Sequence, residues 1–133
     1  MTYLLDTSAI SSLMREEVAL LAWLRSLASP DEAVTCVVVL GEVLFGLERL
    51  PVSRRRKDLE AKSNALFAAV RCLAVPPGAA AHYARVKLSQ QRRGLALDEN
   101  DLWIAATALA IDATLVTRDR DFESIESIRL VLP

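Results

Sequence analysis

Short apolar runs alternate with helix-like segments along this chain, and this alternation limits the possible folds more than any other feature. The apolar runs that suit buried strands cover residues 3–5, 33–36, 72–75, 113–117 and 128–132. The helix-like segments begin at residue 9 and then cover residues 17–27, 38–50, 54–70, 79–93 and 98–111. No hairpin signal joins two of the runs, and strands connected through helices pair in parallel by right-handed crossovers. We therefore expect a parallel sheet covered by helices on both faces, with ligands bound outside the carboxyl ends of its strands.

The length and composition are typical of one soluble globular domain. The chain has 133 residues, 53% of them hydrophobic, and its 16 Lys and Arg residues nearly balance 17 Asp and Glu residues, giving a net charge of −1. A chain of this length can bury about two thirds of its unfolded surface, which is enough for a core. We expect a single domain over residues 1–133. The charge balance excludes a protein that coats nucleic acid broadly, so any contact with nucleic acid must be local.

The cysteines and the apolar stretches indicate the compartment. Cys36 and Cys72 both lie in apolar runs, where reduced cysteines pack as small hydrophobic residues. The most apolar stretch, residues 33–47, is interrupted by Glu42, and residues 102–111 are half the length of a membrane span. Asp6 lies where the apolar part of a signal peptide would be. We therefore expect a cytoplasmic protein with no transmembrane helix.

The residues that are scarce exclude several kinds of active site. His82 is the only histidine, which rules out a ribonuclease with two catalytic histidines, an HExxH protease and a histidine-rich zinc site. Gly41 and Gly46 have the spacing of a phosphate-binding P-loop, but Leu47 and Glu48 stand where Lys and Ser or Thr are required. If the chain is an enzyme, its chemistry must come from carboxylates.

Two acids follow predicted strands and should lie at the same edge of the sheet. Asp6 comes directly after the first apolar run, and Asp119 lies two residues after the fourth. The carboxyl ends of parallel strands meet at one edge, so these two acids form a candidate site. Each also has a purely structural interpretation, in which Asp6 caps the following helix and Asp119 stabilises a turn.

Glu42 is the only charged residue in the stretch 33–47. Its neighbours at helical spacing, Val38 and Phe45, are apolar. Burying an ionised carboxylate costs several kcal/mol unless it is paired or binds a metal. Glu42 is therefore a candidate functional residue, and the alternative is a salt bridge to a nearby arginine.

A third group of acids precedes the apolar helix at residues 102–106. Asp98 is well placed as the N-cap of this helix, and Asp101 lies in its first turn, where the helix dipole stabilises negative charge. If these carboxylates gathered with Asp6, Glu42 and Asp119, they would raise one another's pKa values unless a cation lay between them. Oxygen ligands alone favour Mg²⁺ or Mn²⁺, and such ions support hydrolysis of phosphodiesters.

Four short motifs lie in order along the chain, at residues 4–8 (LLDTS), 41–43 (GEV), 100–106 (NDLWIAA) and 115–122 (LVTRDRDF). They resemble the motifs of the PIN-domain ribonucleases, in particular the VapC toxins of bacterial toxin-antitoxin pairs. Each motif alone is weakly specific. The ordered set spans essentially the whole chain at the spacing of the family, and the set is specific.

The resemblance implies an α/β fold with three layers, α/β/α, around a central, mainly parallel five-stranded sheet. It implies that the metal ligands and catalytic residues are Asp6, Glu42, Asp101 and Asp119. Asp121 corresponds to a further metal-binding acid found in some members, and Asp98 is left as a cap or as a neighbour of the ligands. The hydroxyls of Thr7 and Thr117 match positions that help to orient the ligands.

The resemblance also implies partners. Members of the family cleave RNA, commonly tRNA or ribosomal RNA in the toxins, form homodimers and are neutralised by a cognate VapB-like antitoxin. The residues themselves add three basic clusters as candidate phosphate contacts, at 54–57, at 92–93 and at Arg118 with Arg120. The alternative is that these clusters are ordinary solvated helix ends and loops.

Two other classes of function remain open at this point. A Mg²⁺-binding phosphoacceptor domain of the receiver type also gathers acids at strand ends, but it needs paired acids after the first strand, where this chain has only Asp6. An interaction protein without catalytic activity could share the same fold. The intact acids favour the metal-dependent endoribonuclease.

Overall fold

The computed structural model describes residues 1–133 and contains a five-stranded sheet, all parallel, in the order β3-β2-β1-β4-β5. Each strand falls within or beside one of the predicted apolar runs. The strands are β1 (Thr2–Leu5), β2 (Glu32–Cys36), β3 (Arg71–Leu73), β4 (Thr114–Val116) and β5 (Leu130–Val131). The predicted parallel sheet is therefore confirmed, with strand ends that differ by at most two residues from the expected ones.

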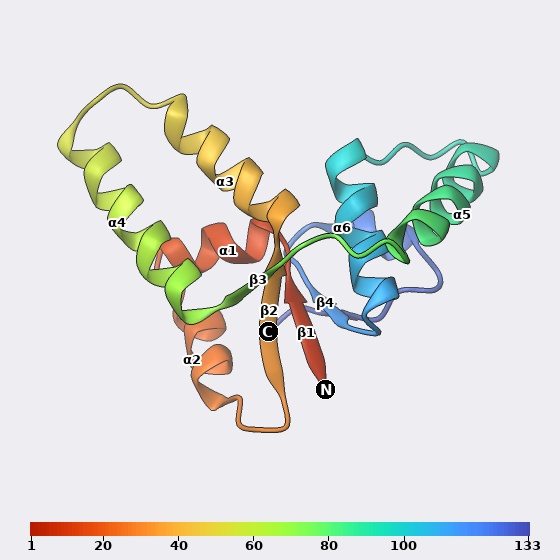
Figure 1. The fold of residues 1–133 in the computed structure, drawn as a ribbon, viewed down its shortest axis with the longest axis horizontal. Coiled ribbons are helices and arrows are strands. Elements are labelled where there is room, and N and C mark those ends of the chain that lie inside the picture. The colour runs from red at the N-terminus through yellow and green to blue at the C-terminus, as the bar shows by residue number, and fades with distance from the viewer.

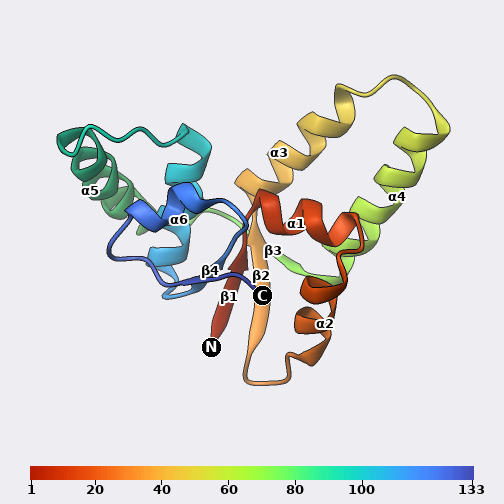
Figure 2. The same cartoon turned by 180° about the vertical axis from the view of Figure 1, so that it is seen from behind.

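Six α-helices and one short 3-10 helix connect the strands. They are α1 (Thr7–Met14), α2 (Val18–Ser26), α3 (Val37–Glu48), α4 (Arg54–Ala69), α5 (Ala79–Arg92), α6 (Glu99–Ala110) and the 3-10 helix η1 (Arg120–Ser124). Figures 1 and 2 show α1, α2 and α4 on one side of the sheet and α5 and α6 on the other. The three-layer α/β/α arrangement is thus confirmed. None of the helices is long and apolar enough to cross a membrane.

Helices α3 and α4 form an arm that extends away from the sheet. Helix α3 starts directly after β2, and the loop that joins it to α4 lies at the far end of the arm (Figure 1). Pro51 follows α3 and cannot continue a helix, and the hydroxyl of Ser53 accepts a hydrogen bond from the backbone N–H of Arg56 to cap α4. We refer below to this pair of helices, residues 37–69, as the α3–α4 arm.

The sheet core is built from the predicted apolar runs. Every residue of β4 is buried, and Leu4, Leu5, Val34 and Leu115 have no exposed surface. Burying side chains of this size contributes roughly 1.5–3 kcal/mol each. Phe122 of η1 is also completely buried. It anchors the segment that follows β4 to the core.

The order of the strands determines where a ligand can bind. From β1 the chain moves outward to β2 and β3, and then returns to the other side of β1 to form β4 and β5. At such a reversal the connections after the two central strands diverge and leave a crevice at their carboxyl ends. The backbone N–H of Asp6 donates to the carbonyl of Val116 (3.1 Å), which holds the ends of β1 and β4 together at this crevice.

Candidate active site at the carboxyl edge of the sheet

Asp6 is held rigidly at the end of β1. Its Oδ1 accepts hydrogen bonds from the backbone N–H of Ala9 (2.8 Å) and from the hydroxyl of Ser8 (2.7 Å), and its Oδ2 accepts one from the hydroxyl of Thr117. Only 3% of Asp6 is exposed. The structural interpretation of Asp6 as the N-cap of α1 is thus correct, and the cap explains why α1 starts at Thr7 and not at Ala9. One oxygen of Asp6 serves the helix, and the other faces the end of β4.

The hydroxyl groups of Thr117 and Ser8 connect the segment after β4 to Asp6. Thr117 Oγ1 accepts a hydrogen bond from the backbone N–H of Asp119 (2.9 Å), and Ser8 Oγ accepts one from the backbone N–H of Arg118 (2.8 Å). Asp119 is half-buried, and its Oδ1 accepts from the N–H of Asp121 (2.9 Å), which caps η1. The predicted turn role of Asp119 is therefore also observed, and the turn leads directly into a 3-10 helix.

Glu42 lies in the second turn of α3 and is held by a threonine. Its Oε1 accepts a hydrogen bond from the hydroxyl of Thr7 (2.6 Å). No Lys or Arg forms an ion pair with Glu42, so the salt-bridge alternative is wrong. Glu42 is half-buried, because the apolar stripe on which it lies is partly at the surface.

The negative charges of Asp6, Glu42 and Asp119 all act on Asp101. It lies in the first turn of α6 and is half-buried. Burial is the largest cause that raises its pKa, to about 7, and further contributions come from the negative charges of Glu42, Asp119, Asp98 and Asp6, in that order. Burial also raises the pKa of Asp6, although the hydrogen bonds from Thr117, Ser8 and Ala9 oppose the shift. Acids from four distant parts of the chain therefore gather at one edge of the sheet.

The remaining predicted acids occupy different surroundings. Asp98 stands at the N-cap position of α6, but its side chain accepts no capping hydrogen bond, so the predicted cap contact is absent. Its carboxylate instead contributes to the negative potential at Asp101. Asp121 is exposed and is not among the acids that raise the pKa of Asp101.

An open hollow of about 540 Å³ lies beside these acids, between the start of α3 and the start of α6. Its lining combines carboxylates with apolar side chains and comes from Val37, Val38, Gly41, Glu42, Phe45, Asp98 and Asn100. The hollow is open to solvent, and Glu42 and Asp98 are the only predicted site acids that line it. The sequence indicated Phe45 only as an apolar neighbour of Glu42 and Asn100 only as part of the motif at residues 100–106, and the structure places both in the lining of the hollow.

The charge and chemistry of this cluster fit a divalent cation. None of Asp6, Glu42, Asp98, Asp101 and Asp119 forms an ion pair with a Lys or Arg residue. Their donor atoms are all carboxylate oxygens, the ligands that Mg²⁺ and Mn²⁺ prefer. No three acidic, Cys or His side chains are arranged as a ready-made coordination group. Carboxylates that repel one another lie apart, so changes of side-chain rotamer would be needed to close them around an ion.

Some residues of the predicted basic clusters form ion pairs or hydrogen bonds within the protein. Arg56 pairs with Glu48 and Glu60, Arg118 pairs with Glu17, and Arg93 donates to the backbone carbonyl of Ser124. The cations of these clusters that form no ion pair and no side-chain hydrogen bond are Arg54, Arg55, Lys57, Arg92 and Arg120.

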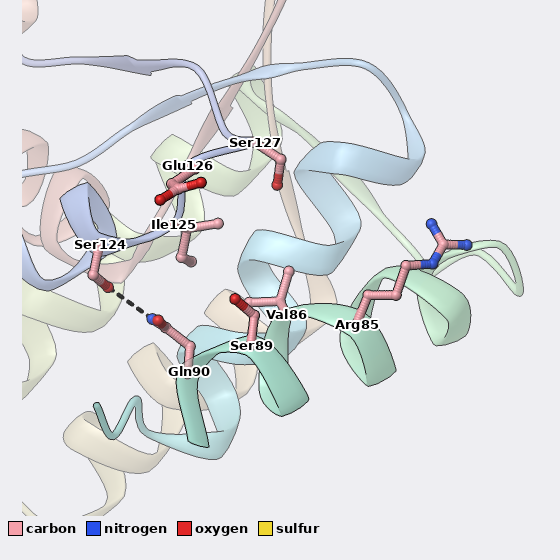
Figure 3. Close-up of a pocket in the computed structure, with 8 residues that line it drawn as sticks. All are labelled: Arg85, Val86, Ser89, Gln90, Ser124, Ile125, Glu126 and Ser127. Atoms are coloured by element: carbon pink, nitrogen blue, oxygen red, sulfur yellow. Dashed lines mark hydrogen bonds between the residues drawn. The ribbon is translucent and has the colours of Figure 1, made fainter. Parts of the chain in front are cut away.

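A second hollow, of about 220 Å³, lies between α5 and the segment that follows η1, and Figure 3 shows its lining. Gln90 points from α5 toward Ser124, and its Nε2 donates to the hydroxyl of Ser124 (2.7 Å). This hollow contains none of the predicted site acids. The contact between Gln90 and Ser124 fixes η1 against α5, and in this way it supports the loop that carries Asp119.

Ser8 is the main contact residue that the sequence analysis missed. It bonds to Asp6 and to the backbone of Arg118, and its hydroxyl lies 3.3 Å from that of Thr117. In the sequence, the indication of a role for Ser8 is its place in the motif at residues 4–8, next to Thr7. The contacts of Thr7 and Thr117 with Glu42 and Asp6 are those that ligand-orienting hydroxyls would make.

Comparisons with known proteins agree on the relatives of this chain. The model of the PIN domain family matches residues 3–127. Ribonuclease VapC5 of Mycobacterium tuberculosis is 31% identical over 73% of this chain and 71% of its own length. Among solved structures, VapBC2 of Rickettsia felis, bound to a promoter DNA fragment, aligns with a TM-score of 0.90 at 23% identity over 98% of both chains. VapBC-5 of M. tuberculosis, a member of a family of toxin-antitoxin systems, aligns with a TM-score of 0.78 at 25% identity over 99% of this chain and 98% of that one.

Proposed function

This chain belongs to the PIN domain family, among its VapC-type members, and we propose on that basis that it is a metal-dependent endoribonuclease that acts as the toxin of a toxin-antitoxin pair. Curated relatives are named as VapC ribonucleases. The observation that carries the proposal is the gathering of four carboxylates, from β1, α3, α6 and the end of β4, at one edge of the sheet without a single paired cation.

We propose that Asp6, Glu42, Asp101 and Asp119 hold one or more Mg²⁺ or Mn²⁺ ions. Such an ion supplies Lewis-acid polarisation of the phosphodiester and neutralises negative charge that develops during hydrolysis. Asp121 is a weaker candidate ligand, because its exposed side chain lies outside the group of acids that influences Asp101.

The polar neighbours support this assignment by fixing the carboxylates before substrate binds. Thr117 and Ser8 hold Asp6, and Thr7 holds Glu42, so two of the four carboxylates have their orientation restrained by hydroxyl donors. Ligands that are already oriented lose less conformational freedom when they bind a cation or a phosphate. The roles of Thr7 and Thr117 are therefore to position ligands and not to react.

The substrate and partners that we propose are those typical of the family. We propose that the substrate is RNA, with tRNA or ribosomal RNA as the expected classes, and that the chain acts as a single domain within a homodimer. VapBC complexes among the structural neighbours support a cognate antitoxin that covers this toxin. The two free cysteines, Cys36 and Cys72, support a reducing cytoplasm.

An RNA cleavage assay tests the proposal. The purified protein should cut tRNA or ribosomal RNA in Mg²⁺ or Mn²⁺ and lose the activity in EDTA. Asp6→Asn and Asp101→Asn should each reduce the rate by at least about 100-fold, since each substitution removes a charged ligand of the metal. Asp112→Asn is the matched control, because Asp112 is exposed and precedes β4, at the opposite edge of the sheet. Full cleavage by Asp6→Asn would contradict the assignment of the site.

A further inference from the structure

Phe45 is a large aromatic residue that lies beside the candidate active site and remains mostly open to solvent. It is 64% exposed, and it lines the same hollow as Glu42 and Asp98. Only about 4.5 Å of helix rise separates Phe45 from Glu42 along α3. An aromatic side chain in this position is not needed for the core, since a smaller or polar residue would fit the surface equally well.

One face of α3 connects the acids with a cation. Val38, Glu42, Phe45 and Arg49 follow one another at intervals of four, three and four residues, which places them on the same face of the helix. The guanidinium carbon of Arg49 lies 5.6 Å from the centroid of the Phe45 ring. Arg49 forms no ion pair within the chain. An exposed aromatic ring and an unpaired cation thus stand in line with a candidate metal ligand.

The positive charge continues at the tip of the α3–α4 arm. Arg54, Arg55 and Lys57 lie in the first turns of α4 and form no ion pair, whereas Arg56 between them is fixed by two glutamates. The first turn of α4 contains no acid, although the helix dipole there favours negative and disfavours positive side chains. These cations therefore have no ion-pair partner within the chain, and they lie at the far end of the arm in Figure 1.

We infer that the α3–α4 arm binds the RNA strand next to the bond that is cut, with one base stacked on Phe45 and the strand continuing past Arg49 toward Arg54, Arg55 and Lys57. This inference rests on the proposed ribonuclease function. Single-stranded RNA is recognised by stacking of bases on exposed aromatic rings and by cations that contact its phosphates. The arm offers both, in order of distance from the carboxylates: aromatic ring first, then cations.

The charge pattern favours RNA over a protein as the occupant of this face. A protein partner that covered Phe45 and Leu44, which is 47% exposed, would also have to supply anions for Arg49 and the arm tip. An RNA strand supplies a base and a regular series of phosphates together. A protein interface, either with a second copy or with another chain, is therefore the outcome against which the inference is tested.

The first experiment measures RNA binding separately from cleavage. A fluorescently labelled single-stranded RNA oligonucleotide of mixed sequence is titrated with Asp6→Asn protein in Mg²⁺, and again with Asp101→Asn protein as a second inactive background. Adding Phe45→Ala should weaken binding roughly 5- to 160-fold, the range for loss of one stacked base. Phe45→Trp should restore binding, and Leu44→Ala, the exposed neighbour on α3, should leave it unchanged.

A second measurement tests the arm tip through salt dependence. Each phosphate contact with single-stranded nucleic acid contributes about 0.7 to the slope of log K against log salt concentration. Combining Arg54→Ala with Lys57→Ala should lower the magnitude of the slope by about 1.4, whereas Lys62→Ala, further along α4, should not change it. An unchanged slope in the double variant would overturn the assignment of the tip.

These outcomes separate the inference from the proposed function. If the wild type cuts RNA with Mg²⁺ and Phe45→Ala cuts and binds RNA equally well, the ribonuclease function stands and the inference is wrong. If Phe45→Ala and Leu44→Ala both change the molar mass in solution, measured by light scattering, and leave RNA binding intact, the face is a protein interface and the inference is again wrong. If the wild type cuts no RNA, the proposed function itself fails.

Discussion

At the scale of single residues, Asp6 serves the fold and the site at the same time. Its Oδ1 caps α1 through the N–H of Ala9, and its Oδ2 accepts a hydrogen bond from the hydroxyl of Thr117, which directly follows the neighbouring strand β4. Loss of an N-cap typically costs about 1 kcal/mol. Asp6→Asn keeps an oxygen acceptor and is therefore a better test of chemistry than Asp6→Ala, which would also remove the cap.

Glu42→Gln should stabilise the metal-free protein at neutral and alkaline pH. The charge of Glu42 is the second cause, after burial, of the raised pKa of Asp101. Removing this charge relieves repulsion between two partly exposed carboxylates, and after solvent screening we expect a gain of roughly 0.5–1 kcal/mol in the free energy of unfolding. Gln can still accept the hydrogen bond from Thr7. Urea unfolding in EDTA measures the gain.

The sign of the pH dependence follows from the direction of the Asp101 shift. Because its folded pKa of about 7 lies above the ordinary value of 3.8, the folded state binds more protons between these two values, and stability falls as the pH rises through this window. The gain from Glu42→Gln should therefore be present at pH 8 and should disappear as the pH falls well below 7, where Asp101 of the folded protein is protonated and is no longer repelled by Glu42. A large loss of stability at pH 8 would indicate that Glu42 has a structural role.

At the scale of the elements, α3 shows that an almost wholly apolar run can form a helix that is buried on one face only. The stretch 33–47 contains one charge and suggested a largely buried segment. In the structure, Val39, Val43 and Leu47 face the core, while Val37, Leu44 and Phe45 are exposed. When a helix is apolar all around, its sequence does not show which face is buried, because the hydrophobic period that would identify that face is missing.

Ser124→Ala should destabilise the contact between α5 and η1. The Ser124 hydroxyl accepts a hydrogen bond from Gln90 and donates one to the carbonyl of Asp121 (2.8 Å). Gln90 is only 3% exposed and its Oε1 already has no partner, so the substitution would leave its whole amide group unpaired. We expect a loss of roughly 1–3 kcal/mol in the free energy of unfolding, measured by chemical denaturation.

Ser127→Ala is the control for this substitution. Ser127 lines the same hollow (Figure 3) but is exposed and forms no side-chain hydrogen bond, so its replacement should change stability by less than about 0.5 kcal/mol. Equal stability of the Ser124 and Ser127 variants would mean that water forms the hydrogen bonds of the Gln90 side-chain amide. The hydrogen bond between Gln90 and Ser124 would then not hold η1 in place.

At the scale of the whole molecule, the sequence predicted the layers of the fold and the edge at which the acids lie. Parallel pairing follows from strands joined through helices, and the carboxyl edge follows from parallel pairing. The contacts among Ser8, Thr117 and Asp119 could not be predicted, because they depend on which strand ends become neighbours. The absent cap at Asp98 and the missing ion pair at Glu42 are likewise decided by side-chain orientation after the fold has formed.

The net charge of −1 does not show how charge is distributed over the molecule. Unpaired acids gather at the carboxyl edge of the sheet, and three of the unpaired cations, Arg54, Arg55 and Lys57, lie together at the tip of the α3–α4 arm. A bound divalent cation would offset the first group and leave the second free to meet phosphates. The overall balance is therefore compatible with a compact site that cuts a polyanion.

Anomalous diffraction from crystals grown with Mn²⁺ tests the central claim most directly, because it locates the ion independently of any activity. The account predicts a strong anomalous peak enclosed by the carboxylates of Asp6, Glu42, Asp101 and Asp119, which is lost in crystals of the Asp6→Asn variant. Rotated side chains of Glu42 and Asp101 should accompany the ion. Saturating Mn²⁺ that leaves no peak among these four carboxylates, in a protein that still cuts RNA, would contradict the account.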